Sequence, residues 1–214
     1  MQQRPNIVFY FSDQQRWDTL GCYGQRLDVT PNLDALAAGG TRYENAFTCQ
    51  PVCGPARACL QTGRYATEIG CEINGFALPF GRVKTLAQCF NEAGYATGYV
   101  GKWHLATDRL AGIDYEQSAI PAERRGGYKD YWMAADVLEF TSHGYNGYVY
   151  NADNERVPFV GYRADCINNF AIDFLHGRKE QVEPFFLFMS QIEPHHQNDR
   201  RRYEGPDGWR AQIA

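Results

Sequence analysis

Three runs of consecutive apolar residues stand out from an otherwise mixed sequence. They are Asn6–Ser12, Tyr95–Gly101 and Pro184–Ser190. Each run is apolar at successive positions rather than at alternate ones, which is typical of a strand covered on both faces. We therefore expect all three to be interior strands of a sheet.

Helices are predicted between these runs. Pro31–Ala38 has leucine and alanine at helical spacing behind Thr30, a residue suited to the N-cap. Thr85–Ala93 forms a second helix closed by Gly94, and a third, from about Arg163 to His176, has an apolar face. Buried strands that alternate with helices indicate an α/β sheet with helices on both faces.

The middle of the chain has a weaker pattern. Residues 106–146 are rich in Gly, Tyr and charged residues without a stable period, so we expect an irregular excursion there. Gly147–Tyr150 and Arg156–Gly161 flank a polar turn at 151–154, which predicts a hairpin and extends the excursion to about residue 161.

Composition excludes several classes of protein. The 214 residues carry a net charge of −4 with scattered Lys and Arg, which argues against a nucleic-acid partner. Seven cysteines without a C-x-x-C pair suggest neither a disulfide framework nor a zinc cage. The run Ile7–Phe11 is too short for a signal peptide or a membrane span, so the chain as written is expected to be cytoplasmic, with no membrane partner.

Polar side chains follow each of the three apolar runs. Taken singly, each has an ordinary explanation: a turn aspartate, a solvated lysine, or a packed or surface histidine. In open α/β sheets, however, ligands bind beyond the carboxyl ends of parallel strands, so these side chains are expected to meet at one edge. The candidates are Asp13, Gln14, Lys102, His104, His195 and His196.

The most specific segment is Cys53–Arg57, which fits the pattern C-x-P-x-R and is followed by Thr62-Gly63-Arg64. Pro55 suits the first turn of a helix, which places Cys53 at the positive end of the helix dipole. A nucleophile and an anionic substrate are both favoured there. The alternative, a buried structural cysteine, describes Cys49 and Cys59 better than Cys53.

These motifs together resemble the N-terminal half of the type I, formylglycine-dependent sulfatases of the alkaline phosphatase superfamily. The resemblance runs in order from residue 4 to about 196. It rests on Arg4–Phe9 leading to Asp13, Pro31–Asp34, Cys53–Arg57 with Thr62–Arg64, Gly101–Leu105 and the histidines near 195. It implies an alkaline-phosphatase-like fold with a largely parallel central sheet, of which residues 1–214 form the N-terminal part of the catalytic domain, incomplete at the C-terminus.

The resemblance also implies a mechanism. A maturation enzyme oxidises Cys53 to formylglycine, whose hydrated aldehyde attacks the sulfur of a sulfate ester of a sugar or an aryl alcohol. Arg57 holds the formylglycine, and Lys102 bridges it to the sulfate. His104 takes the proton that allows the covalent sulfate to be released. His195 faces the leaving-group oxygen, with His196 as the alternative register.

The metal site implied by the resemblance contains Asp13, Gln14 and the modified Cys53. Oxygen ligands favour a hard divalent cation, calcium first, with magnesium or manganese as alternatives. Many sulfatases have two adjacent aspartates where this chain has Asp13-Gln14. They also supply further metal ligands and a lysine beyond the position of Ala214, so the 214 residues alone are expected to be inactive.

Three questions remain open from the sequence. A formylglycine-dependent phosphodiesterase or phosphonate monoester hydrolase would need the same cationic site, because its substrate is also a tetrahedral monoanion. A truncated, non-catalytic fragment is the rival from another class. Asn74 is a turn residue or a substrate contact.

Overall fold

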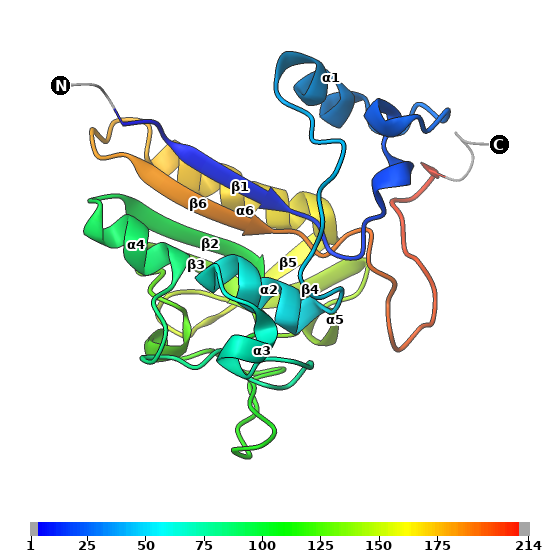
Figure 1. The fold of residues 1–214 in the computed structure, drawn as a ribbon. Coiled ribbons are helices and arrows are strands. Elements are labelled where there is room, and N and C mark those ends of the chain that lie inside the picture. The colour runs from blue at the N-terminus through cyan, green and yellow to red at the C-terminus, as the bar shows by residue number, and fades with distance from the viewer. Residues whose placement is uncertain (1–3, 210–214) are drawn as a thin grey trace.

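The structure is a computed structural model that describes residues 4–209. Within this part of the chain, one mixed sheet contains six strands: β1 (Ile7–Phe11), β2 (Ala96–Lys102), β3 (Tyr131–Ala135), β4 (Tyr145–Tyr150), β5 (Arg156–Tyr162) and β6 (Phe185–Ser190). Their order is β1-β6-β2-β3-β4-β5 (Figure 1). The first four in this order are parallel, whereas β4 and β5 pair antiparallel.

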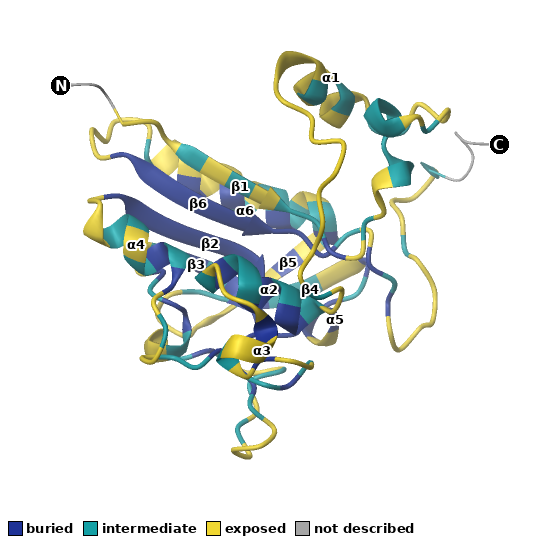
Figure 2. Ribbon diagram, viewed as in Figure 1, coloured by how far each residue is buried: buried dark blue, intermediate teal, exposed yellow. Residues whose placement is uncertain are grey.

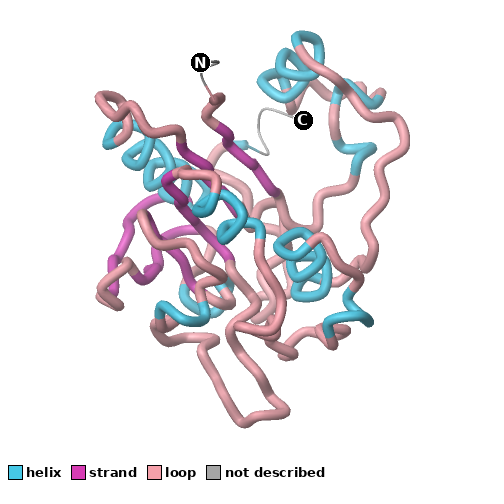
Figure 3. Tube along the Cα trace, turned by 60° about the vertical axis from the view of Figure 1, so that its left-hand side comes forward, coloured by secondary structure: helices cyan, strands magenta, loops and turns pink. Residues whose placement is uncertain are grey.

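Helices lie on both faces of the sheet, as expected for an α/β fold. α6 (Arg163–Gly177) covers one face, and α2 (Cys53–Thr62) and α4 (Leu86–Glu92) cover the other (Figure 1). α1 (Pro31–Gly39) lies apart from the sheet (Figure 3). The remaining short elements are α3 (Ala66–Ile69), α5 (Leu138–Thr141) and 3-10 turns at Trp17–Thr19, Gly21–Tyr23 and Ala122–Arg124. None of the helices described is long and apolar enough to cross a membrane.

Strand β6 is apolar from Phe185 to Met189 because side chains on both of its faces are buried. Phe186 and Phe188 belong to the apolar cluster on the α4 side, and Phe186 stacks on Phe90 with ring centroids 4.1 Å apart. Phe185 belongs to the cluster on the α6 side, where it packs against Phe174. All residues of β6 and β2 are buried (Figure 2), which confirms the interior strands predicted at 95–101 and 184–190.

The predicted helices and the hairpin are also confirmed. α4 begins after Thr85, whose hydroxyl accepts from the Gln88 N–H while the Gln88 side chain accepts from the Thr85 N–H. This reciprocal capping box fixes the first turn of the helix. α6 begins at Arg163, as its apolar face predicts, and β4 and β5 form the antiparallel hairpin.

Two expectations were wrong. β1 lies at an edge of the described sheet, with Val8 51% and Tyr10 53% exposed, although its sequence predicts an interior strand. The apolar run identifies the strand, but its position depends on pairing with β6, far later in the chain. Residues 106–146 are not wholly irregular, because β3 adds a parallel strand beside β2 and α5 follows it.

The register of the parallel strands brings their carboxyl ends level with one another. Phe11 of β1 and Gly101 of β2 both pair with Ser190 of β6. Gly101 has φ 101°, and a Cβ at this position would collide with the carbonyl oxygen of Ser190. Glycine therefore allows β2 to approach β6 closely just before Lys102, at the edge where Asp13 also emerges.

Candidate active site

Cys53 is the first residue of α2, which begins after Val52. Pro55 lies in the first turn, where its missing N–H leaves no hydrogen bond unmade. The N–H of Gly54 donates to Asn74 Oδ1 at 2.8 Å. Asn74 is thus a partner of the helix start, and the unsatisfied N–H groups of this turn give the surroundings of Cys53 a positive potential.

The carboxylate of Asp13 is buried between two cations. Its Oδ2 lies 3.1 Å from Arg57 Nη2 and 3.0 Å from Lys102 Nζ, and its Oδ1 lies 3.6 Å from Cys53 Sγ. Burial by itself would raise the pKa of Asp13, but Lys102 and Arg57 outweigh burial and hold this pKa well below its usual range. Asp13 is therefore a permanent anion at the centre of the site.

Lys102 is fully buried and has a second acidic partner. Its Nζ lies 2.8 Å from Glu139 Oε1 as well as 3.0 Å from Asp13 Oδ2. Burial would lower the pKa of Lys102, but the charges of Glu139 and Asp13 outweigh burial and raise it. The side chains of Arg57, Asp13, Lys102 and Glu139 therefore form a continuous row of alternating charge, which we call the charge row.

Arg57 joins α2 to the sheet. Its Nη1 donates to the carbonyl of Lys102 at 2.8 Å and to Ser190 Oγ at 2.5 Å. The guanidinium carbon lies 5.1 Å from the ring centroid of Phe11. One buried side chain thus contacts the ends of β1, β2 and β6 together.

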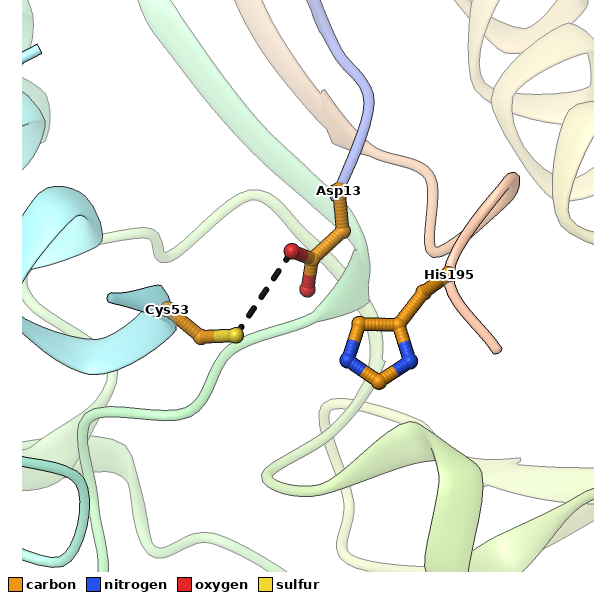
Figure 4. Close-up of side chains that lie close together, drawn as sticks. All are labelled: Asp13, Cys53 and His195. Carbon is orange, nitrogen blue, oxygen red and sulfur yellow. Dashed lines mark hydrogen bonds between the residues drawn. The ribbon is translucent and has the colours of Figure 1, made fainter. Parts of the chain in front are cut away.

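His195 lies beside Asp13 and Cys53, and the three residues offer ligand atoms within 4.8 Å of one another (Figure 4). Its Nδ1 is 2.6 Å from the carbonyl oxygen of His196, and because a carbonyl only accepts, Nδ1 carries a proton. In the neutral ring, Nε2 is then free to accept. Burial and, after it, the charge of Lys102 lower the pKa of His195.

His104 is held in an unusual backbone conformation, with φ 58°. Its N–H donates to the carbonyl of Asp136 at 2.8 Å, and its buried Nδ1 has no partner among the residues described. Burial first, and then the charge of Lys102, lower the pKa of His104 to about 3. The imidazole is therefore neutral at physiological pH, with an unprotonated ring nitrogen that can accept a hydrogen bond.

Asp136 fixes the segment that carries His104. Its carboxylate accepts from the N–H groups of Leu105, Ala106 and Thr107 at 2.9, 3.0 and 2.9 Å. Burial raises the pKa of Asp136, and the three donors oppose that rise. Asp136 and Glu139 both follow β3, so the unrecognised strand explains why the sequence did not point to them.

Gln14 and His196 contact each other rather than Cys53 or the charge row. The amide oxygen of Gln14 accepts from the His196 N–H at 3.1 Å and lies 3.0 Å from His196 Nδ1. Of the predicted metal ligands, Asp13 therefore places an oxygen beside Cys53, whereas the amide oxygen of Gln14 is hydrogen-bonded to His196. His195, not His196, is the histidine that approaches Cys53.

An open cavity of about 930 Å³ adjoins this group of residues. Asp13, Cys53 and His195 lie on its wall, together with apolar side chains that include Phe47 and Leu60. A concave, mostly apolar space of this size with a few polar groups is typical of a small-molecule site. The cavity gives a ligand access to Cys53.

The structure thus places a cysteine at a helix start, beside the buried cations Arg57 and Lys102, at the carboxyl edge of the parallel strands of an alkaline-phosphatase-like α/β fold. The chain belongs to the sulfatase family, whose family model matches residues 5–211. It is 38% identical over 204 residues to the sulfatase YidJ of Escherichia coli (strain K12), covering 91% of this chain and 39% of that protein. It is 42% identical over 223 residues to arylsulfatase A of Homo sapiens, covering 90% of this chain and 41% of that protein.

A solved structure supports the same assignment. A protein in complex with its substrate, D-glucosamine-2-N,6-O-disulfate, superposes with a TM-score of 0.74 and 29% identity over 90% of this chain and 35% of that chain. The chain thus spans about two fifths of the length of the two curated relatives named above.

Proposed function

We propose that this chain carries the nucleophile and the anion-binding half of an enzyme that hydrolyses sulfate monoesters. The observation that carries the proposal is the position of Cys53 at the start of α2, beside Asp13 and His195 and next to the buried cations Arg57 and Lys102. A transferring sulfuryl group carries negative charge on several oxygens, so fixed cations are the main source of catalysis.

The environment of Cys53 favours a modified side chain over a thiolate nucleophile. Burial raises the pKa of the Cys53 thiol, and the opposing charge of Lys102 does not reverse this. Reactive thiolates need the opposite shift. Oxidation of Cys53 by a maturation enzyme would convert it to the aldehyde formylglycine, and addition of water to that aldehyde would give a geminal diol with a hydroxyl nucleophile at the same position.

The remaining residues take complementary roles. Arg57 holds modified Cys53 in position, and Lys102 bridges it to the sulfate oxygens. His104, neutral because of its low pKa, accepts a proton from the hydroxyl of modified Cys53. His195 faces the leaving-group oxygen with Nε2, since its Nδ1 donates to the His196 carbonyl.

A divalent cation fits this site in part. Asp13 Oδ1 and the oxygen of modified Cys53 would hold it, with Gln14 after release from His196. Hard oxygen ligands favour calcium over magnesium or manganese when several are supplied. When bound, the cation would add positive charge where the substrate gains negative charge.

The substrate class that we propose is a sulfated sugar. The support comes from the similarity to a protein solved with a glucosamine disulfate, and from the volume of the cavity beside Cys53. An aryl sulfate would enter the same cavity, and it serves as the convenient assay substrate.

The test measures Cys53 modification and ester hydrolysis in the same preparation. The full-length protein is produced with a formylglycine-generating enzyme, and peptide mass spectrometry follows Cys53. Hydrolysis of an aryl sulfate and of a phosphonate monoester is then compared for the wild type, for Cys53→Ala and for the control Cys89→Ala. Cys89 is exposed and lies outside the motif.

We expect modified Cys53 and sulfate release that is lost only in Cys53→Ala. A higher kcat/KM on the phosphonate ester would favour a phosphonate monoester hydrolase instead. A modified Cys53 without turnover of either ester would favour a non-catalytic protein. Turnover that survives in Cys53→Ala would refute the nucleophile.

A further inference from the structure

Glu139 is a buried carboxylate that the proposed mechanism does not use. It lies in α5, directly after β3, and its side chain is only 3% exposed. Its Oε1 is 2.8 Å from Lys102 Nζ, and its Oε2 has no hydrogen-bond partner among the residues described. A buried carboxylate with one free oxygen costs desolvation energy, so its presence at the site needs an explanation.

The charge row is neutral as a whole. Arg57 and Lys102 contribute two positive charges, and Asp13 and Glu139 contribute two negative charges. Each cation contacts Asp13, but only Lys102 contacts Glu139. Lys102 thus has two acidic partners at hydrogen-bonding distance, and an incoming anion competes with both of them.

This balance matters for the reaction because the charge of the bound species changes. A sulfate monoester carries one negative charge, whereas inorganic sulfate carries two. A site with excess positive charge would bind the dianionic product more tightly than the substrate, and slow product release then limits turnover. A carboxylate against Lys102 opposes that preference.

We propose that Glu139 is a positioning residue that holds the ammonium of Lys102 in place and weakens the binding of product sulfate. The role in turnover rests on the proposed function, but the effect on sulfate affinity does not. Glu139 touches neither Cys53 nor Asp13 in the contacts that the structure records, so it acts through Lys102.

The test substitutes Glu139→Gln, which keeps the size of the side chain and an oxygen that accepts from Lys102 but removes the charge. Calorimetry measures the binding of inorganic sulfate to the full-length protein at a fixed calcium concentration. We expect sulfate to bind on the order of tenfold more tightly, the factor that corresponds to one pKa unit of charge interaction. The kcat for an aryl sulfate should fall, and KM should fall with it.

A matched control removes an ion pair elsewhere. Glu183 pairs with Arg178 beyond the C-terminus of α6, at the end of the sheet where β6 begins. Glu183→Gln should leave sulfate affinity and kcat unchanged. Glu139→Asp keeps the negative charge but shortens the side chain and so displaces the Lys102 ammonium. Sulfate should then bind no more tightly than to the wild type, and kcat should fall.

Each outcome supports or overturns the proposal. A merely structural role of Glu139 predicts weaker sulfate binding in Glu139→Gln, since a disturbed site binds every ligand less well. Unchanged or weaker binding would therefore overturn the proposal, as would tighter binding in Glu139→Asp. Tighter sulfate binding without any ester hydrolysis would support the charge balance and refute the proposed function. Ester hydrolysis by the wild type, together with unchanged sulfate affinity in Glu139→Gln, would support the proposed function and refute the charge balance.

Discussion

Replacement of Asp136 by Asn tests whether the segment after β2 is held as the structure indicates. The Asp136 carboxylate accepts three backbone N–H groups, two at Oδ1 and one, from Thr107, at Oδ2. Asn keeps one acceptor oxygen and turns an NH2 group toward the remaining donor. At least one charge-assisted hydrogen bond is lost and one buried N–H is left unpaired, for a combined cost of about 2 to 4 kcal/mol.

Urea denaturation of Asp136→Asn measures this cost as a change in the free energy of unfolding. The matched control is Asp114→Asn, because Asp114 accepts a single N–H, from Glu116, at an exposed turn. The control should change stability by less than about 0.5 kcal/mol. Since His104 precedes the capped segment, kcat should fall in Asp136→Asn as well. Surface substitutions usually change the free energy of unfolding by no more than about 0.5 kcal/mol. A change in Asp136→Asn that is no larger than this would refute the reasoning.

Three further predictions each concern one side chain. Asn74→Ala removes the acceptor of the Gly54 N–H and should lower stability by about 1 kcal/mol in urea denaturation, the usual value of a helix-start cap. Burial raises the pKa of the Cys71 thiol to about 12, so iodoacetamide should alkylate exposed Cys89 well before Cys71, as peptide mass spectrometry would show. The pKa of His104 is lowered to about 3, so the unfolded chain binds the extra proton between pH 3 and about 6.5. Stability should fall as pH decreases through that window, with a smaller slope in His104→Gln.

The site was more predictable than the strand order. Asp13, Lys102 and His195 follow apolar runs, and the convergence of parallel strand ends is a general property of α/β sheets. This rule predicts that the three residues lie at one edge of the sheet without any knowledge of side-chain geometry. The catalytic roles assigned to them remain predictions.

β3 shows where the sequence argument failed. Tyr131–Ala135 is short and lies between glycine-rich and tyrosine-rich segments, so its apolar pattern is no stronger than that of its surroundings. Its position is fixed by pairing with β2 from Gly98 to Lys102. Once β3 is known, Asp136 and Glu139 satisfy the same strand-end rule that identified Asp13. Asp136 and Glu139 were therefore overlooked because β3 was not predicted, and not because their chemistry is of a different kind.

The charge row links the architecture to the chemistry that we propose. A buried ion pair is weak evidence for stability, because desolvation of two charges offsets much of their attraction. The buried side chain of Arg57 has a second role, because it also joins α2 to the carbonyl of Lys102 and to Ser190. The same guanidinium that binds Asp13 therefore sets the position of the helix that begins with Cys53. The position of Cys53 is therefore tied to the positions of both cations. In the reaction that we propose, this coupling would supply the preorganisation that stabilises a developing anion.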